Sequence, residues 1–126
     1  MSLDNVIDVA RGLKPGDLVI KNVNILNFFT GRIDQNMDVA IIGDTIAGIN
    51  KNYEGKEEID GSGKFLTPGF VDSHVHIESS MVSVYEYAEA VAKNGTTSVV
   101  ADPHEIANVL GLDGIRYILY SSKYSP

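Results

Sequence analysis

Hydrophobic positions in the first part of the chain change their spacing close to residue 16. Residues 4–13 carry apolar side chains over one broad face at helical spacing, and Gly12 and Pro15-Gly16 follow as stop signals. Residues 18–28 instead alternate between apolar and polar positions, and many of the apolar ones are β-branched. We therefore expect a short helix followed by a strand.

Short strand signals continue up to residue 67. Residues 38–42 and 45–49 are two apolar runs, and Gly43-Asp44 between them matches a two-residue hairpin turn. Residues 64–66 form a further short apolar run. Residues 1–67 are therefore predicted to form a short N-terminal helix and a small antiparallel, sandwich-like β-domain.

From residue 70 onward, strand signals alternate with helix signals. Two strands are expected at 70–77 and 96–101. Between them, Ser83 and Glu86 have the spacing of a capping box, and apolar side chains follow at helical spacing. A second helix is expected at about 113–122. This β-α-β-α order is typical of a parallel α/β architecture, so residues 68–126 are predicted to form two β/α units.

Composition narrows the classes of function. The chain has 126 residues, with 10 Lys+Arg against 17 Asp+Glu and a formal net charge of -7. This acidic balance argues against nucleic acid or an anionic membrane as a partner. The chain has no cysteine, which excludes disulfides and thiolate metal sites and fits a reducing cytoplasm. A cytoplasmic protein is therefore expected.

Two histidines near the end of the first strand of the second half carry the strongest chemical signal. His74 and His76 stand at i and i+2, a spacing that places both side chains on one face of a strand. Asp72 and Glu78 share this phase, and the face becomes polar toward the carboxyl end of the strand. Parallel α/β enzymes place their sites at that end. Two imidazoles so arranged can share a metal ion.

A second polar cluster follows the other predicted strand of this half. Asp102 and His104 stand just past its carboxyl end, and Glu105 comes next. One interpretation is that they face the same site as the two histidines. The other is that Asp102-Pro103 only begins a turn and caps a following helix.

Several segments together resemble one enzyme family. Residues 68–76 have the pattern P-G-x-x-D-x-H-x-H, which resembles the first barrel strand of the metal-dependent amidohydrolase superfamily. Residues 76–81 (HIESSM) and 102–109 (DPHEIANV) are similar to stretches of the microbial adenine deaminases within it. Gly95-Thr96-Thr97 and residues 17–22 (DLVIKN) are similar as well. The resemblance extends over nearly the whole chain.

The resemblance implies a fold, a reaction and a set of residues. It implies the start of a (β/α)8 TIM barrel, which needs about 250 residues when complete, so the chain is expected to be an N-terminal fragment that is inactive by itself. The whole enzyme is expected to convert adenine to hypoxanthine and ammonia with a pair of divalent ions, Mn, Fe or Zn. An open sheet edge also favours a homo-oligomer. The implied residues are His74 and His76 as metal ligands, His104 and Glu105 as catalytic candidates, and Asp72, Glu78 and Asp102 as substrate-contacting or supporting side chains.

Two alternatives remain open from the sequence. The enzyme could be another amidohydrolase, acting on a cyclic amide or an N-acetyl sugar, because no residue in this chain is known to contact a purine directly. The chain could also be a non-catalytic β-rich assembly module. The polar strand end at Asp72, His74, His76 and Glu78 argues against the second, because a purely structural strand gains nothing from it.

Overall fold

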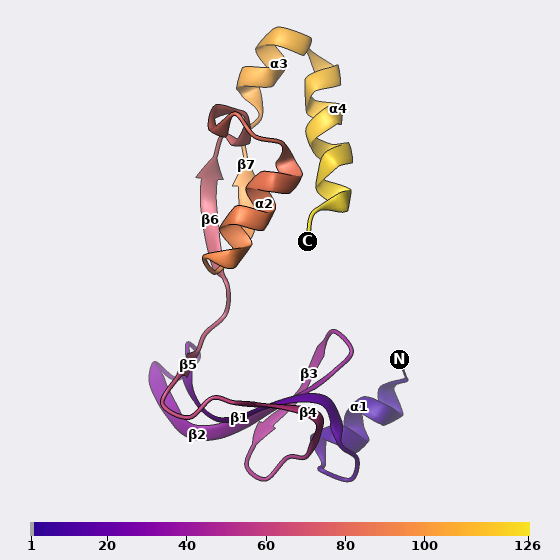
Figure 1. The fold of residues 1–126 in the computed structure, drawn as a ribbon, viewed down its shortest axis with the longest axis vertical. Coiled ribbons are helices and arrows are strands. Elements are labelled where there is room, and N and C mark those ends of the chain that lie inside the picture. Colours follow the sequence, from indigo (N-terminus) through magenta and orange to yellow (C-terminus); the bar gives the residue numbers. More distant parts are fainter. Residues whose placement is uncertain (1) are drawn as a thin grey trace. The chain divides into compact units, whose positions relative to one another are not determined.

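The computed structural model describes residues 2–126, which form two compact units. The first unit ends at Thr67 and the second runs from Pro68 to Pro126 (Figure 1). Within the described residues, no helix is long and apolar enough to cross a membrane.

The first unit is one sheet with a helix beside it. Helix α1 (Leu3–Ala10) precedes five strands, in the order β3-β2-β1-β4, with the short β5 also pairing with β1. The strands are β1 (Gly16–Asn27), β2 (Arg32–Ile42), β3 (Thr45–Asn50), β4 (Gly55–Asp60) and β5 (Phe65–Leu66). The hairpin predicted at Gly43-Asp44 joins β2 to β3, and Gly43 has the positive φ of 58° that such turns require.

The expectation of a purely antiparallel, sandwich-like unit needs correction. Strands β1, β2 and β3 are antiparallel, but β4 and β5 pair with β1 in parallel. The described strands of this unit form one mixed sheet and no second facing sheet. A parallel neighbour requires a crossover rather than a hairpin, and β4, with its run of charged residues, lacks the apolar alternation of a strand.

The core of the first unit lies between α1 and the sheet. Val9 of α1 packs with Val19, Ala40 and Tyr53, all of them buried. The hydroxyl of Tyr53 donates a hydrogen bond of 2.7 Å to the main-chain oxygen of Ala10, at the end of α1. Each fully buried valine contributes about 1.5–3 kcal/mol to folding, so this contact holds the helix on the sheet.

A buried carboxylate ties the centre of the sheet to the loop before β4. The side chain of Asp38 is 5% exposed, and one of its oxygens lies 2.7 Å from Nζ of Lys21. The main-chain N–H groups of Asn22 and Tyr53 also donate to the Asp38 carboxylate, at 3.0 and 3.2 Å. The charge of Asp38 is therefore paired and hydrogen-bonded, as a buried charge must be.

The second unit has the predicted order of strand, helix, strand and helix. Strand β6 (Phe70–Val75) leads through the 3-10 turn η1 (Ile77–Ser80) to α2 (Val84–Lys93), and β7 (Thr96–Ala101) pairs with β6 in parallel. The chain continues through α3 (His104–Leu110), α4 (Leu112–Ser121) and the 3-10 turn η2 (Ser122–Tyr124). The capping box at Ser83 and Glu86 is formed at the start of α2. The sequence pattern missed α3 as a separate helix.

The core of this unit holds α2 and α4 against the two strands (Figure 1). Ile77, Val84 and Ile118 are buried together, and Val75 and Val99 pack against them. This is the layer order of a β/α unit, in which helices cover a parallel sheet and leave its strand ends open to build a site.

Candidate functional site

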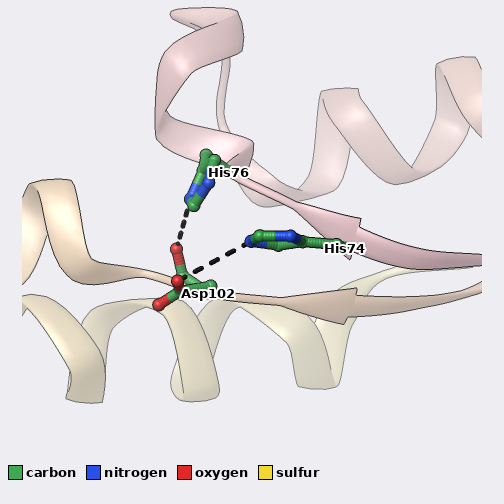
Figure 2. Close-up of side chains that lie close together, drawn as sticks. All are labelled: His74, His76 and Asp102. Atoms are coloured by element: carbon green, nitrogen blue, oxygen red, sulfur yellow. Dashed lines mark hydrogen bonds and ion pairs between the residues drawn. The ribbon is translucent and has the colours of Figure 1, made fainter.

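The site lies where β6 and β7 end. Because the strands are parallel, their carboxyl ends meet at the same edge. His76, directly after β6, still has an extended backbone, with φ -105° and ψ 94°. Figure 2 shows His74 and His76 beside Asp102, which directly follows β7. The ring centroids of the two histidines are 4.8 Å apart.

Asp102 contacts all three histidines of the chain. Its main-chain oxygen lies 2.8 Å from Nδ1 of His76. Its carboxylate oxygen Oδ2 lies 3.7 Å from Nε2 of His74 and 3.2 Å from Nδ1 of His104. The side chain of Asp102 is 53% exposed, so its carboxylate remains open to solvent.

These residues have the donor atoms that a divalent metal ion requires. One ligand atom each from His74, His76 and Asp102 lie within 4.8 Å of one another, and the same holds for His76, His104 and Glu105. Imidazole nitrogen with carboxylate oxygen suits Zn, Mn or Fe. The two groups share His76, so they form one continuous cluster, and its residues fit the metal that the sequence resemblance implies.

Glu78 supports this cluster through the start of α3, and not from the strand face that the sequence predicts it to share with the histidines. Its Oε1 accepts hydrogen bonds from the main-chain N–H groups of Glu105 and Ile106, at 3.1 and 3.3 Å. Burial alone would raise the pKa of Glu78, but its own N–H, those two N–H groups and the nearby His76 hold that pKa below its usual value. Glu78 is therefore an anionic acceptor at the start of α3.

The proposed role of Asp102 as a helix cap does not match the structure. Helix α3 does begin at His104, but its N-cap is Pro103 and it has no side-chain cap hydrogen bond. The carboxylate of Glu78, 27 residues earlier in the chain, accepts from the first turn of α3 instead. Asp102 is thereby left to contact the histidines.

Asp72 is not brought into the cluster. Its carboxylate accepts a hydrogen bond of 3.1 Å from the main-chain N–H of His74. Burial raises the pKa of Tyr87 on α2, and the negative charge of Asp72 raises it further. The charge of Asp72 therefore acts on a side chain of α2. The pairing of β6 with β7 is irregular between Asp72 and Val75, where three steps on β6 match two on β7. The prediction that Asp72 shares a face with His74 assumed that side chains alternate regularly along β6. That alternation does not hold across this stretch.

Sequence reasoning missed Ser79. Its hydroxyl lies 2.7 and 2.8 Å from the two carboxylate oxygens of Glu105, to which it can donate. The only available signal was its position next to Glu78 in the segment after the histidines. No local rule pairs two residues that are 26 positions apart.

A protein-family model matches the second unit of the chain. The model of the Amidohydrolase family matches residues 65–123, which contain every member of the cluster.

Curated relatives match over the whole chain. An adenine deaminase of Clostridium acetobutylicum is 55% identical over 124 residues, which are 98% of this chain and 21% of that protein. An adenine deaminase of Kosmotoga olearia is 51% identical over 126 residues, which are 100% of this chain and 22% of that protein. The chain thus spans about a fifth of the length of the curated relatives it matches.

A solved structure supports the fold. The N-acyl-D-glutamate deacylase of Bordetella bronchiseptica, solved with zinc and a phosphonate inhibitor, matches with a TM-score of 0.58. It is 24% identical, over 70% of this chain and 19% of that one. At this identity the likeness concerns the fold, which is mixed α/β as in the opening part of an amidohydrolase.

Proposed function

This chain belongs to the amidohydrolase family, as the N-terminal part of a protein of the adenine deaminase type, and on that premise we propose a function for the whole protein. The whole protein hydrolyses adenine to hypoxanthine and ammonia, with divalent metal ions as cofactors. The 126-residue chain contributes part of the metal site and has no deaminase activity by itself.

One observation carries this proposal. A chain about half identical, from end to end, to adenine deaminases brings His74, His76 and Asp102 together at the ends of adjacent parallel strands. In barrel enzymes, this end of the strands holds the catalytic side chains. The identity supports the substrate, and the cluster supports the use of a metal.

His74 and His76 are the proposed metal ligands, and Asp102 adjoins them. A bound divalent ion would supply a water molecule whose pKa is lowered far below that of bulk water, toward about 7. A pair of ions, with Mn, Fe or Zn as the candidates, needs more ligands than these residues offer, so other strands of the whole protein must supply the rest.

His104 and Glu105 are the proposed candidates for contact with the substrate or for proton transfer. Nδ1 of His104 faces the Asp102 carboxylate, which leaves Nε2 for another partner. The carboxylate of Glu105 is held by the Ser79 hydroxyl. Both side chains are exposed at the strand ends, where a substrate can reach them.

The test uses the purified whole protein and the 126-residue chain side by side, each supplied in turn with Mn, Fe(II) and Zn. The product of each substrate is measured: ammonia and hypoxanthine from adenine, the ring-opened acid from a cyclic amide, and acetate from an N-acetyl sugar. We expect turnover of adenine only, by the whole protein only, and its loss after chelation. Turnover of another substrate without adenine would retain the amidohydrolase chemistry and reject adenine. Absence of both turnover and metal would favour an assembly module.

Self-association and a cytoplasmic location complete the proposal. Within residues 2–126, β6 and β7 pair only with each other, and such open edges favour pairing between copies. Light scattering of the 126-residue chain, in which these edges are open, tests the homo-oligomer at several concentrations, and a constant monomer mass would reject it. Cell fractionation tests the location.

A further inference from the structure

We propose that Glu78 is a positioning residue, which fixes the turn of His104 and Glu105 against the end of β6. This inference rests on the proposed function for the activity that it affects, but the contacts that define it do not depend on any substrate.

Helix α3 depends on Glu78 for its first turn. The first N–H groups of a helix have no partner within the helix, and a side chain at the N-cap usually accepts from them. The N-cap of α3 is Pro103, which has no side-chain acceptor. Oε1 of Glu78 takes this place, accepting from Glu105 and Ile106 at 3.1 and 3.3 Å.

Glu78 is itself held firmly in place. It lies on the turn η1, which is closed by main-chain hydrogen bonds from Ser79 to His76 and from Met81 to Glu78, both 3.1 Å long. Ile77, the residue before it, is only 4% exposed and anchors the turn in the core of the unit. A fixed carboxylate positions its partner better than a mobile one, because less rotamer freedom is lost.

A second contact acts on the same pair of elements. Ser79 of η1 reaches the carboxylate of Glu105, so adjacent residues of η1 bind the main chain and the side chain of α3. His76 comes just before η1, and His104 begins α3. The ring centroids of these two histidines are 4.6 Å apart. The Glu78 contact therefore sets the distance between a proposed metal ligand and a proposed catalytic candidate.

The experiment compares Glu78→Ala, Glu78→Gln and the control Glu89→Ala in the metal-loaded whole protein. Glu89 lies on α2, pairs with Lys93 and takes no part in the cluster. Three quantities are measured: hydrogen exchange in the peptide covering residues 102–110, the metal content, and kcat and KM for adenine.

In Glu78→Ala we expect exchange in residues 102–110 to accelerate by up to about tenfold. We expect kcat to fall by about 10–100-fold, as is typical when partners of a metal site are removed, while KM stays within about threefold. Glu78→Gln keeps an acceptor oxygen, so both exchange and kcat should return to within about threefold of wild type. Glu89→Ala should leave all three quantities unchanged.

Unchanged exchange in Glu78→Ala would overturn the proposal for any substrate. A Glu78→Gln variant as slow as Glu78→Ala would also overturn it, because the charge rather than the acceptor would then matter. If Glu78→Ala does not accumulate, Glu78→Gln together with Ser79→Ala decides the question: a normal kcat in Ser79→Ala and a severe loss in Glu78→Gln would contradict positioning. An inactive wild-type protein would reject the proposed function, while the exchange measurement would still test the role of Glu78.

Discussion

Nδ1 of His76 lies 2.8 Å from the main-chain oxygen of Asp102, and this contact fixes the chemistry of the ring. A carbonyl oxygen can only accept, so Nδ1 must carry the proton and donate it. In a neutral ring, Nε2 then keeps the lone pair that the proposed metal ion would bind. The contact also joins the ends of β6 and β7, so the tautomer depends on the pairing of the two strands.

Loss of either proposed metal ligand should remove both metal and activity. In the whole protein, we expect His74→Ala and His76→Ala each to lower the metal content and to reduce adenine turnover by at least about 100-fold, at or beyond the range seen when only a supporting partner is lost. Elemental analysis and ammonia release measure the two effects. Glu89→Ala serves as the control. Full metal content in both histidine variants would contradict the assignment.

The charge of Asp102 should strengthen metal binding. Asp102→Asn keeps the main-chain contact to His76 and nearly the same size, but it removes the negative charge beside His74 and His104. We expect the dissociation constant for the metal to rise by about 10–100-fold. Metal titration measures this effect against Asp113→Asn, which changes an exposed aspartate paired with Arg116. Equal affinities in the two variants would exclude a role for the Asp102 charge.

Asp38 should make the first unit sensitive to acid. Burial alone would raise the pKa of Asp38, but Lys21 and the N–H groups of Asn22 and Tyr53 hold it below the usual 3.8. A carboxyl with a lowered folded pKa stabilises the fold above its unfolded pKa, and this contribution is lost as the pH falls through the folded pKa. The contribution is therefore complete near pH 7 and declines below about pH 4.

The matching variant is Asp38→Asn, which leaves Lys21 without its ion-pair partner. We expect it to lower the free energy of unfolding by about 3–5 kcal/mol at pH 7, and by less as the pH falls below 4. Urea unfolding of the 126-residue chain at several pH values measures this difference. Asp44→Asn, at the exposed hairpin, should change stability by less than about 0.5 kcal/mol. A difference that grows toward acid pH would contradict the ion pair.

The capping box of α2 should contribute a measurable share of the stability of the second unit. The hydroxyl of Ser83 accepts from the N–H of Glu86 at 3.3 Å, and the Glu86 carboxylate accepts from the N–H of Ser83 at 3.0 Å. Ser83→Ala should cost about 1 kcal/mol of unfolding free energy, whereas Ser83→Asn should cost little, since asparagine caps equally well. Urea unfolding compares the two variants. An equal loss in both would argue against capping.

Local rules predicted the elements that depend on neighbouring residues. Each of these elements is determined by residues only a few positions apart: the turn at Gly43-Asp44, the cap at Ser83 and the strand that begins at Thr96. The proximity of His74 and Asp102 was also foreseeable, because the carboxyl ends of parallel strands share an edge.

Features that depend on distant partners were not predictable from the sequence. β4 has a charged sequence and becomes a strand because β1 offers it a parallel edge. The first turn of α3 is capped by Glu78, across 27 positions of sequence, and not by Asp102, the local candidate for its cap. The irregular pairing of β6 displaced Asp72 from its predicted face, because alternation holds only where a ladder is regular.

The central place of β1 in its sheet has a consequence for synthesis. Of the described strands, β1 is synthesised first, and β2 soon covers one of its edges, but the other edge waits for β4 and β5. β5 ends at Leu66, 39 residues after the end of β1. At about 5–20 residues per second, this edge stays open for roughly 2–8 s. A nascent chain of this protein therefore exposes an unpaired edge of β1 for several seconds before the first unit can close.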